Sequence, residues 1–355
     1  MNIQLCNYIT EIEQLLSDEE HSEVIAHCQH VLSFFPKNLA IYRLYGLALL
    51  LSGDTKDAAD LFYRVLSVVP DDVISHVGLA AHFEVLGDYP RASGHLTQAF
   101  EVQPYNTSIK EVLLKIRSIR NGGDASDAKM SRGALARIYL RGGNPRQAFE
   151  ELSVALRSTP NIVSLRALMA RTQYLMGHRV EAVNTSNELI EQLPYCAAAN
   201  CVLFLTTSLI GRPNQAQDYF RHIHAVDPYL AERMSGDRQV DELEIPRLEY
   251  IQPSETDAAN VPEWLRELGL VDDSRYNDDS ATEDPEQESN LGSDSTVPII
   301  VSLLRNQKGD ISYDVMDEMA SQLSPQGNNQ IALSQNRWET GDESLDMLDD
   351  LRTRR

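Results

Sequence analysis

Residues 39–72 read LAIYRLYGLALLLSGDTKDAADLFYRVLSVVPDD, and this stretch decides the fold. Apolar side chains recur every three or four residues on both sides of Gly53, which is the spacing of one face of an α-helix. Glycine tolerates the left-handed backbone that ends a helix, and proline stops a helix from continuing. The stretch therefore predicts a helical hairpin that turns at Gly53 and whose second helix ends before Pro70.

The same pattern recurs at a constant interval along the chain. The prolines that end the units form two evenly spaced sets, Pro36, Pro70 and Pro104, then Pro160, Pro194 and Pro228. A small or short side chain stands at the same distance before each proline, at Val24, Ala58, Ala92, Ala148, Ala182 and Ala216. Turn glycines lie at Gly53, Gly87, Gly143, Gly177 and Gly211. Six hairpins are therefore expected, and the longer gap between Pro104 and Pro160 contains one period and an insertion.

The pattern resembles the tetratricopeptide repeat, whose signature has an aromatic residue, Leu-Gly and Tyr on the first helix and Ala, Phe, Ala and Pro on the second. The second unit carries matching side chains at Tyr42, Tyr45, Gly46, Leu49, Ala58, Phe62, Val65 and Pro70. Units one and six depart from the signature, with Ile12 and Phe204 where the small residue belongs. The resemblance covers residues 5–230 apart from the insertion and implies an all-α fold, an α-α solenoid of helical hairpins that binds other proteins.

The chain divides by pattern and charge. We expect two blocks of three repeats at residues 5–106 and 129–230, separated by residues 107–128, and a capping segment at residues 231–251. An acidic linker at residues 252–295 and a tail with short amphipathic helices at residues 296–355 follow. Residues 107–128 contain apolar side chains at helical spacing and then a turn, so they form either an inserted helix or a seventh unit that has lost its second helix.

Charge excludes some classes of function. The whole chain has a formal net charge of -22, of which residues 1–230 contribute -4 and residues 231–355 contribute -18. Residues 107–146 are locally basic, but a chain this acidic is not expected to have nucleic acid as its main partner. No apolar run approaches the roughly 20 residues of a membrane span, no secretory signal is recognisable, and the four cysteines are too sparse for a disulfide framework. These features predict a cytoplasmic protein.

The sequence contains none of the common catalytic or cofactor-binding motifs that we considered. The sequence lacks the phosphate-binding, metal-binding and nucleophile motifs GxxxxGK[ST], GxGxxG, HExxH and GxSxG, so neither an enzyme nor a cofactor is predicted. His21, His27, Cys28 and His30 form a local cluster, but Cys28 falls at a packing position of the repeat. We interpret this cluster as part of the core and not as a metal site.

The family resemblance places peptide-binding residues on the first helices, which line the concave face of the solenoid. Carried over position by position, they are Arg43, Leu47 and Leu50 in the first block and Arg137, Arg141, Arg171 and Tyr174 in the second. Arginine binds carboxylates through two hydrogen bonds, so a row of arginines beside an aromatic ring suits an acidic, partly apolar peptide. Solvated arginines, or arginines paired with neighbouring acids, are the alternative.

The acidic half holds a short island with helical signals, in which Val261, Trp264, Leu265 and Leu268 share one face. It is interpreted as a docking motif, with packing against the last repeat as a cap as the alternative. The acidic tail is long enough to reach the basic groove of its own chain, and docking on another chain stays open. The sequence as a whole predicts a non-catalytic interaction scaffold or adaptor for an acidic or amphipathic protein partner. A regulatory or assembly subunit of an enzyme or secretion complex is the alternative.

Overall fold

The computed structural model describes residues 2–121, 129–235 and 243–248. The docking motif at residues 261–268 and the remaining acidic tail lie outside them. The first seven helices are α1 (Leu5–Ser17), α2 (His21–Phe34), α3 (Leu39–Ser52), α4 (Thr55–Val68), α5 (Val73–Val85), α6 (Tyr89–Val102) and α7 (Thr107–Asn121). The next seven are α8 (Arg132–Arg141), α9 (Pro145–Ser158), α10 (Val163–Leu175), α11 (Arg179–Gln192), α12 (Ala197–Leu209), α13 (Pro213–Val226) and α14 (Pro228–Ser235). Two short strands, β1 (Asn2–Gln4) and β2 (Glu244–Pro246), complete the described elements.

The helices form the expected hairpins, and turn glycines and capping side chains explain where the helices begin and end. All five turn glycines have a positive φ, between 70° and 98°, which confirms the predicted left-handed turns. Short polar side chains start the second helices, as at Asp54 and Asp88, whose carboxylates accept hydrogen bonds from Asp57 N and Arg91 N. The all-α solenoid predicted from the regular period is therefore present.

Phe62 shows how consecutive units pack. Its ring is fully buried and lies between Gly46 of α3 and Gly78 of α5. A Cβ atom added at Gly46 would lie 2.8 Å from the ring, and one added at Gly78 would lie 2.2 Å from it. The two glycines therefore allow one phenylalanine to contact its own unit and the next.

Helix α7 starts in the register of the repeat. It begins at residue 107, one full period after the start of α5 at residue 73, and the side chain of Asn106 accepts a hydrogen bond from Ile109 N at 3.1 Å. Asn38 and Asp72 cap α3 and α5 in the same way. Helix α7 therefore starts at the position where the first helix of a further unit would start.

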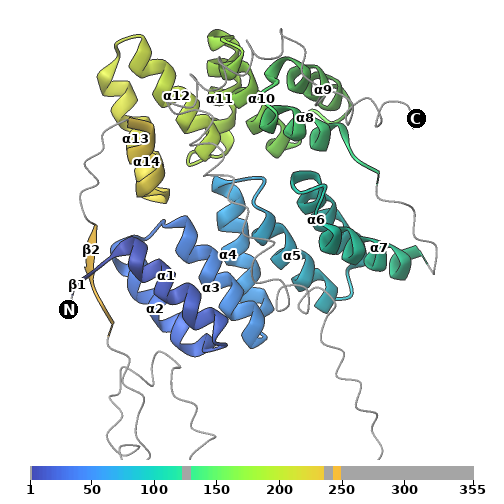
Figure 1. The fold of residues 1–355 in the computed structure, drawn as a ribbon, viewed down its shortest axis with the longest axis vertical. Coiled ribbons are helices and arrows are strands. Elements are labelled where there is room, and N and C mark those ends of the chain that lie inside the picture. Colours follow the sequence, from blue (N-terminus) through green and yellow to red (C-terminus); the bar gives the residue numbers. More distant parts are fainter. Residues whose placement is uncertain (1, 122–128, 236–242, 249–355) are drawn as a thin grey trace, which may run out of the picture.

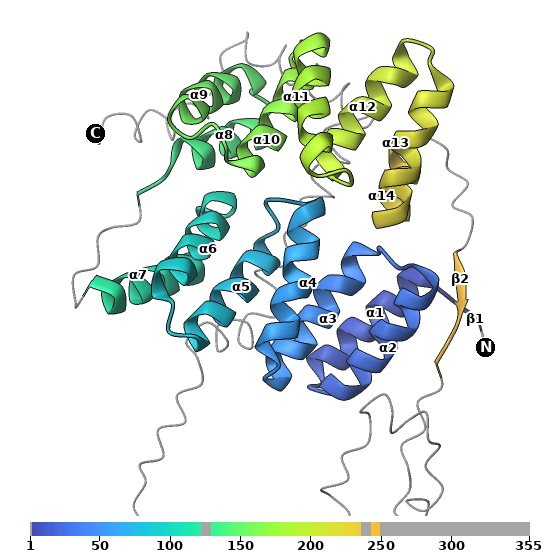
Figure 2. The ribbon, with the colours of Figure 1, turned by 180° about the vertical axis from the view of Figure 1, so that it is seen from behind.

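The array is folded into two tiers. Helices α1–α7 (the N-terminal block) form one tier and helices α8–α14 (the C-terminal block) the other, as two opposite views show (Figures 1 and 2). The loops that connect successive units face each other across the junction between the tiers, which we term the seam. The seam brings together residues that are far apart in the sequence, such as Asp71 with Arg137 and Lys37 with Tyr195.

A small sheet joins the two ends of the array. Strand β2 pairs antiparallel with β1, with Ile3 opposite Ile245, and both lie beside α1 and α2 (Figure 1). Ile245 is 2% exposed and packs with Tyr8 and Ile12 in the core of the first unit. Residues 243–248 therefore cover the apolar end of the N-terminal block. None of the described helices is long and apolar enough to cross a membrane.

Candidate functional site

The seam is the candidate site because it gathers charged groups that are rarely buried. Arg137 of α8, Arg171 of α10 and Arg43 of α3 have exposed fractions of 3%, 2% and 9%. The acidic groups come from residues 69–72, the loop between α4 and α5, which we term the plug loop. Its two aspartates, Asp71 and Asp72, are also buried.

Each aspartate of the plug loop has its own arginine. Asp71 Oδ2 lies 3.3 Å from Nη1 of Arg137 in the C-terminal block, and Asp72 Oδ1 lies 2.6 Å from Nη2 of Arg43 in the N-terminal block. Charged N–H···O hydrogen bonds are usually about 2.7–2.9 Å long, so the pair across the seam is the looser one. Within the described residues, Nε of Arg137 has no hydrogen-bond partner. The buried guanidinium of Arg137 is therefore incompletely satisfied by Asp71.

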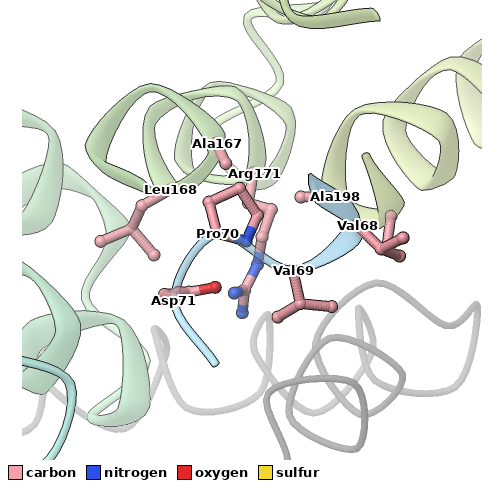
Figure 3. Close-up of a pocket in the computed structure, with 9 residues that line it drawn as sticks. Val68, Val69, Pro70, Asp71, Ala167, Leu168, Arg171 and Ala198 are labelled. Atoms are coloured by element: carbon pink, nitrogen blue, oxygen red, sulfur yellow. The ribbon is translucent and has the colours of Figure 1, made fainter. Parts of the chain in front are cut away.

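The plug loop lies against the C-terminal block. Figure 3 shows Pro70 and Asp71 beneath α10, close to Leu168 and to the guanidinium of Arg171, while Val68 and Val69 lie toward Ala198 of α12. The space left in this hollow is about 10 Å³, which is roughly the volume that holds one water molecule. The first helices of the fifth and sixth units therefore hold an apolar and acidic segment that comes from the chain itself.

A hydrogen-bond chain fixes the plug loop from the side of the N-terminal block. His76 Nε2 donates to the carbonyl of Pro70 at 3.1 Å, and its Nδ1 lies 3.1 Å from Nδ1 of His95. Both rings are neutral near pH 7 because the pKa of each is lowered to about 4, and in a neutral His76 that donates from Nε2 the Nδ1 atom accepts from Nδ1–H of His95. The pKa of His76 is lowered from 6.5 to about 4, mainly by burial; the hydrogen bond to Pro70 and the charge of Asp72 oppose this shift, and the charge of Arg137 adds to it. Burial and the neighbouring His76 and Arg91 lower the pKa of His95 to about 4.

The same hydrogen bond to a unit-ending proline recurs with other side chains. Tyr42 Oη donates to Pro36 O at 2.7 Å, and Asn200 Nδ2 donates to Pro194 O at 2.9 Å. Tyr42, His76 and Asn200 all stand six positions after their proline, at the fourth position of a unit. The repeat therefore uses this position to hold its connecting loop, and any side chain with a suitable donor serves.

Contacts at the other connecting loops extend the seam. Lys37 Nζ lies 3.8 Å from the ring centre of Tyr195 and donates to its hydroxyl group. Arg141 Nη2 donates to the carbonyl of Val102 at 2.9 Å. All three connecting loops of the N-terminal block thus contact the C-terminal block at or beside their ends.

Of the predicted groove residues, the four arginines have contacts at the seam, through Asp72, Asp71, the plug loop and Val102, and all of them except the exposed Arg141 are buried. Arg43, Arg137 and Arg171 are buried, as are Leu50 at 2% and Tyr174 at 9% exposure. Leu47 is half-buried, and Arg141 takes part in the seam through Val102. The arginines of the C-terminal block and an acidic, apolar segment are therefore brought together, with the segment supplied by the N-terminal block.

Sequence reasoning missed the plug loop itself. The available signal is the Asp71-Asp72 pair directly after Pro70, because none of the other five unit-ending prolines is followed by an acidic residue. The partnership of Asp71 with Arg137 has no signal in the local sequence, since it depends on how the two blocks fold together.

Two members of the histidine and cysteine cluster near the N-terminus, His27 and Cys28, are buried in the core, and the other two, His21 and His30, are half-buried. Cys28 is fully buried, and its burial raises the pKa of the thiol. His27 Nδ1 lies 2.8 Å from the hydroxyl oxygen of Tyr8, and burial lowers the pKa of His27. Over the described ranges, no group of three or more histidine, cysteine or acidic side chains is arranged to hold a metal ion.

Comparison with known proteins adds little beyond the fold. No family model and no curated protein matches the chain. Among solved structures it is similar to PilF of Pseudomonas aeruginosa, with 15% identity, a TM-score of 0.26, and coverage of 62% of this chain and 91% of that one. YrrB, a tetratricopeptide-repeat protein described as having an unusual peptide-binding site, matches with 14% identity, a TM-score of 0.28 and coverage of 59% and 97%. PilW, a type IV pilus biogenesis factor, matches with 16% identity, a TM-score of 0.30 and coverage of 62% and 93%. At these scores the assignment of the fold rests on the hairpins described above.

Proposed function

We propose that this tetratricopeptide-like array is a non-catalytic protein–protein interaction scaffold or adaptor, whose C-terminal block binds an acidic, partly apolar segment of a partner protein. One observation carries the proposal. The C-terminal block already holds such a segment, the plug loop, with Arg137 and Arg171 beside its acid and with Ala167 and Ala198 beside its apolar side chains.

The expected ligand has the same kinds of side chain as the plug loop. Val69 and Pro70 supply apolar contacts, the proline restricts the backbone before binding, and Asp71 supplies the charge. A partner segment with the same order of side chains competes with the plug loop for the same surface. Binding then requires the two blocks to part at the seam, so affinity depends on how firmly the plug loop is held.

The acidic tail belongs to the same proposal. Residues 231–355 carry a net charge of -18, and a tail of the same chain competes at a high effective concentration with any partner from outside. The partner is a protein or peptide, and the chain works in the cytoplasm without a cofactor of its own.

A binding measurement tests the proposal. A fluorescently labelled peptide of residues 67–73 is titrated with the full chain and with its Asp71→Asn variant, and binding is followed by anisotropy. Asp71→Asn weakens the plug loop, so the affinity for the peptide should rise by about fivefold or more. Asp60→Asn, the same substitution on the exposed face of α4, is the matched control and should leave the affinity unchanged. A peptide that binds neither chain at millimolar concentration refutes the proposed site.

The alternative is a regulatory or assembly subunit that stays docked on one large partner. Exposed apolar side chains at the turns within hairpins favour it, because Leu86, Val180, Leu209 and Ile210 are each more than half exposed. Replacing Leu209 and Ile210 together by serine should abolish association with such a partner and leave binding of the peptide at the seam intact. Loss of both activities would assign the two surfaces to one site.

A further inference from the structure

The triplet Val-Pro-acid occurs twice in the chain. It forms residues 69–71 of the plug loop, as Val69, Pro70 and Asp71, and it recurs in the acidic tail at residues 261–263, which read Val-Pro-Glu. The remaining Val-Pro pair, at residues 297–298, is followed by isoleucine. The only other place in the sequence with the triplet that the seam holds is therefore the docking motif predicted from the sequence.

A longer acidic side chain than Asp71 can make a closer ion pair with Arg137. The ion pair of Asp71 with Arg137 spans 3.3 Å, and Nε of Arg137 has no hydrogen-bond partner among the described residues, although the side chain is 4% exposed. A glutamate at the same place carries its carboxylate one methylene group farther, about 1.3 Å, from the backbone. That extension is enough to shorten the pair to the usual length of a charged hydrogen bond.

The length of chain between Leu248 and Val261 sets how far the tail can reach. Leu248 is fixed beside α1, where its N–H donates to the hydroxyl group of Tyr8 at 3.1 Å. Residues 249–260 then lead to Val261. A flexible segment of this length spans about 20 Å on average and about 45 Å when extended. Strand β2, which shortly precedes Leu248, lies beside the N-terminal block, which forms one side of the seam (Figure 1).

We propose that residues 261–263 of the tail are a second ligand of the seam, with Glu263 taking the place of Asp71 against Arg137 and Arg171. The inference rests on the proposed function, since it requires that the seam is a peptide site. The plug loop and the tail are then two ligands of the same chain that exclude each other. An outside partner that carries Val-Pro-acid competes with both.

Tryptophan fluorescence isolates the tail without a label. The two tryptophans of the chain are Trp264 and Trp338, so the described array contributes no tryptophan signal. In the full chain with Trp338→Phe, acrylamide quenching reports only the exposure of Trp264, which directly follows Glu263. Docking of the tail should make the quenching constant at least about twofold lower than that of the same chain with Glu263→Lys.

Two further variants distinguish docking at the seam from docking elsewhere. Asp71→Asn weakens the competing plug loop and should lower the quenching of Trp264 further, whereas Asp60→Asn should not change it. Pro298→Ala alters the Val-Pro pair that lacks an acid and should have no effect. An excess of the peptide of residues 67–73 should raise the quenching to the level of Glu263→Lys.

Each contrary result overturns the inference. Equal quenching with and without Glu263→Lys excludes docking through this acid. Protection of Trp264 that ignores both Asp71→Asn and the peptide places the tail at another surface, and protection that vanishes on dilution assigns it to a second copy of the chain. If the labelled peptide nevertheless binds the Asp71→Asn chain, the proposed function stands and only the role of the tail fails.

Discussion

Acidification should loosen the seam through His76, and the size of the effect follows from its surroundings. His76 is buried and neutral, with a pKa lowered from 6.5 to about 4. The folded chain binds a proton at His76 less readily than the unfolded chain does. The contribution of neutral His76 to the free energy of unfolding is therefore complete above about pH 6.5. It is lost as the pH falls toward 4. At pH 5 the loss amounts to about 2 kcal/mol for this one histidine.

The perturbation that isolates this effect is His76→Asn. Asparagine keeps a donor for the carbonyl of Pro70, as Asn200 does for Pro194 in the sixth unit at 2.9 Å, but it does not titrate. It also removes a neighbouring group that lowers the pKa of His95. Between pH 7.5 and pH 5 the free energy of unfolding should fall in both chains. We expect the fall to be smaller in the variant, by about 2 kcal/mol or more.

The assay is urea unfolding followed by far-ultraviolet circular dichroism at the two pH values. With a slope of about 2 kcal/mol per molar urea, the difference corresponds to a relative shift of about 1 M in the unfolding midpoint. Carboxylate titration is common to both chains and cancels. His178→Asn, a substitution at an exposed histidine, serves as the control and should follow the unmodified chain. A His76→Asn chain whose midpoint falls as far as that of the unmodified chain would refute the reasoning.

Two further predictions concern packing and capping, and both are read from thermal or urea unfolding of the full chain. Gly78→Ala places a methyl group 2.2 Å from the ring of Phe62 and should destabilise the chain by about 1–3 kcal/mol. Gly94→Ala, in the middle of α6, meets no atom within 4 Å and should stabilise the chain by up to about 1 kcal/mol. Equal effects of the two substitutions would contradict the packing of Phe62. Asp72→Ala removes both the cap of α5, where Oδ2 accepts from Ser75 N at 2.9 Å, and the carboxylate 2.6 Å from Arg43, and should cost about 4 kcal/mol. A loss below about 1 kcal/mol would show that the pair with Arg43 contributes little.

Sequence reasoning captured the hairpins because their causes are local. Gly53 and its equivalents adopt the left-handed turn wherever they stand, and Phe62 packs against Gly46 of its own unit and Gly78 of the next unit. A repeat packs only against its neighbours, so its signature contains most of the information that its packing requires. The register of α7 was also readable, since Asn106 stands one full period after Asp72.

The surroundings of the predicted groove residues could not be read in the same way. From their positions, Arg137 and Arg171 were expected either to bind the carboxylates of a peptide or to be solvated or paired with neighbouring acids. Arg137 pairs with Asp71, which belongs to a loop of the other block. The same applies to the sheet of β1 and β2, whose strands lie at opposite ends of the described chain.

The sequence by itself therefore determined the repeat, the helix boundaries and the kind of side chain that each face presents, because these follow from backbone preference and from contacts within about one period. Only the tertiary structure decided which surfaces are covered. The closure of the two blocks sums many weak contacts between distant loops, from Lys37 with Tyr195 to Asp71 with Arg137. No local sequence pattern shows these contacts between distant loops. The closure of the two blocks replaces the predicted open groove with a seam that already holds a segment of its own chain.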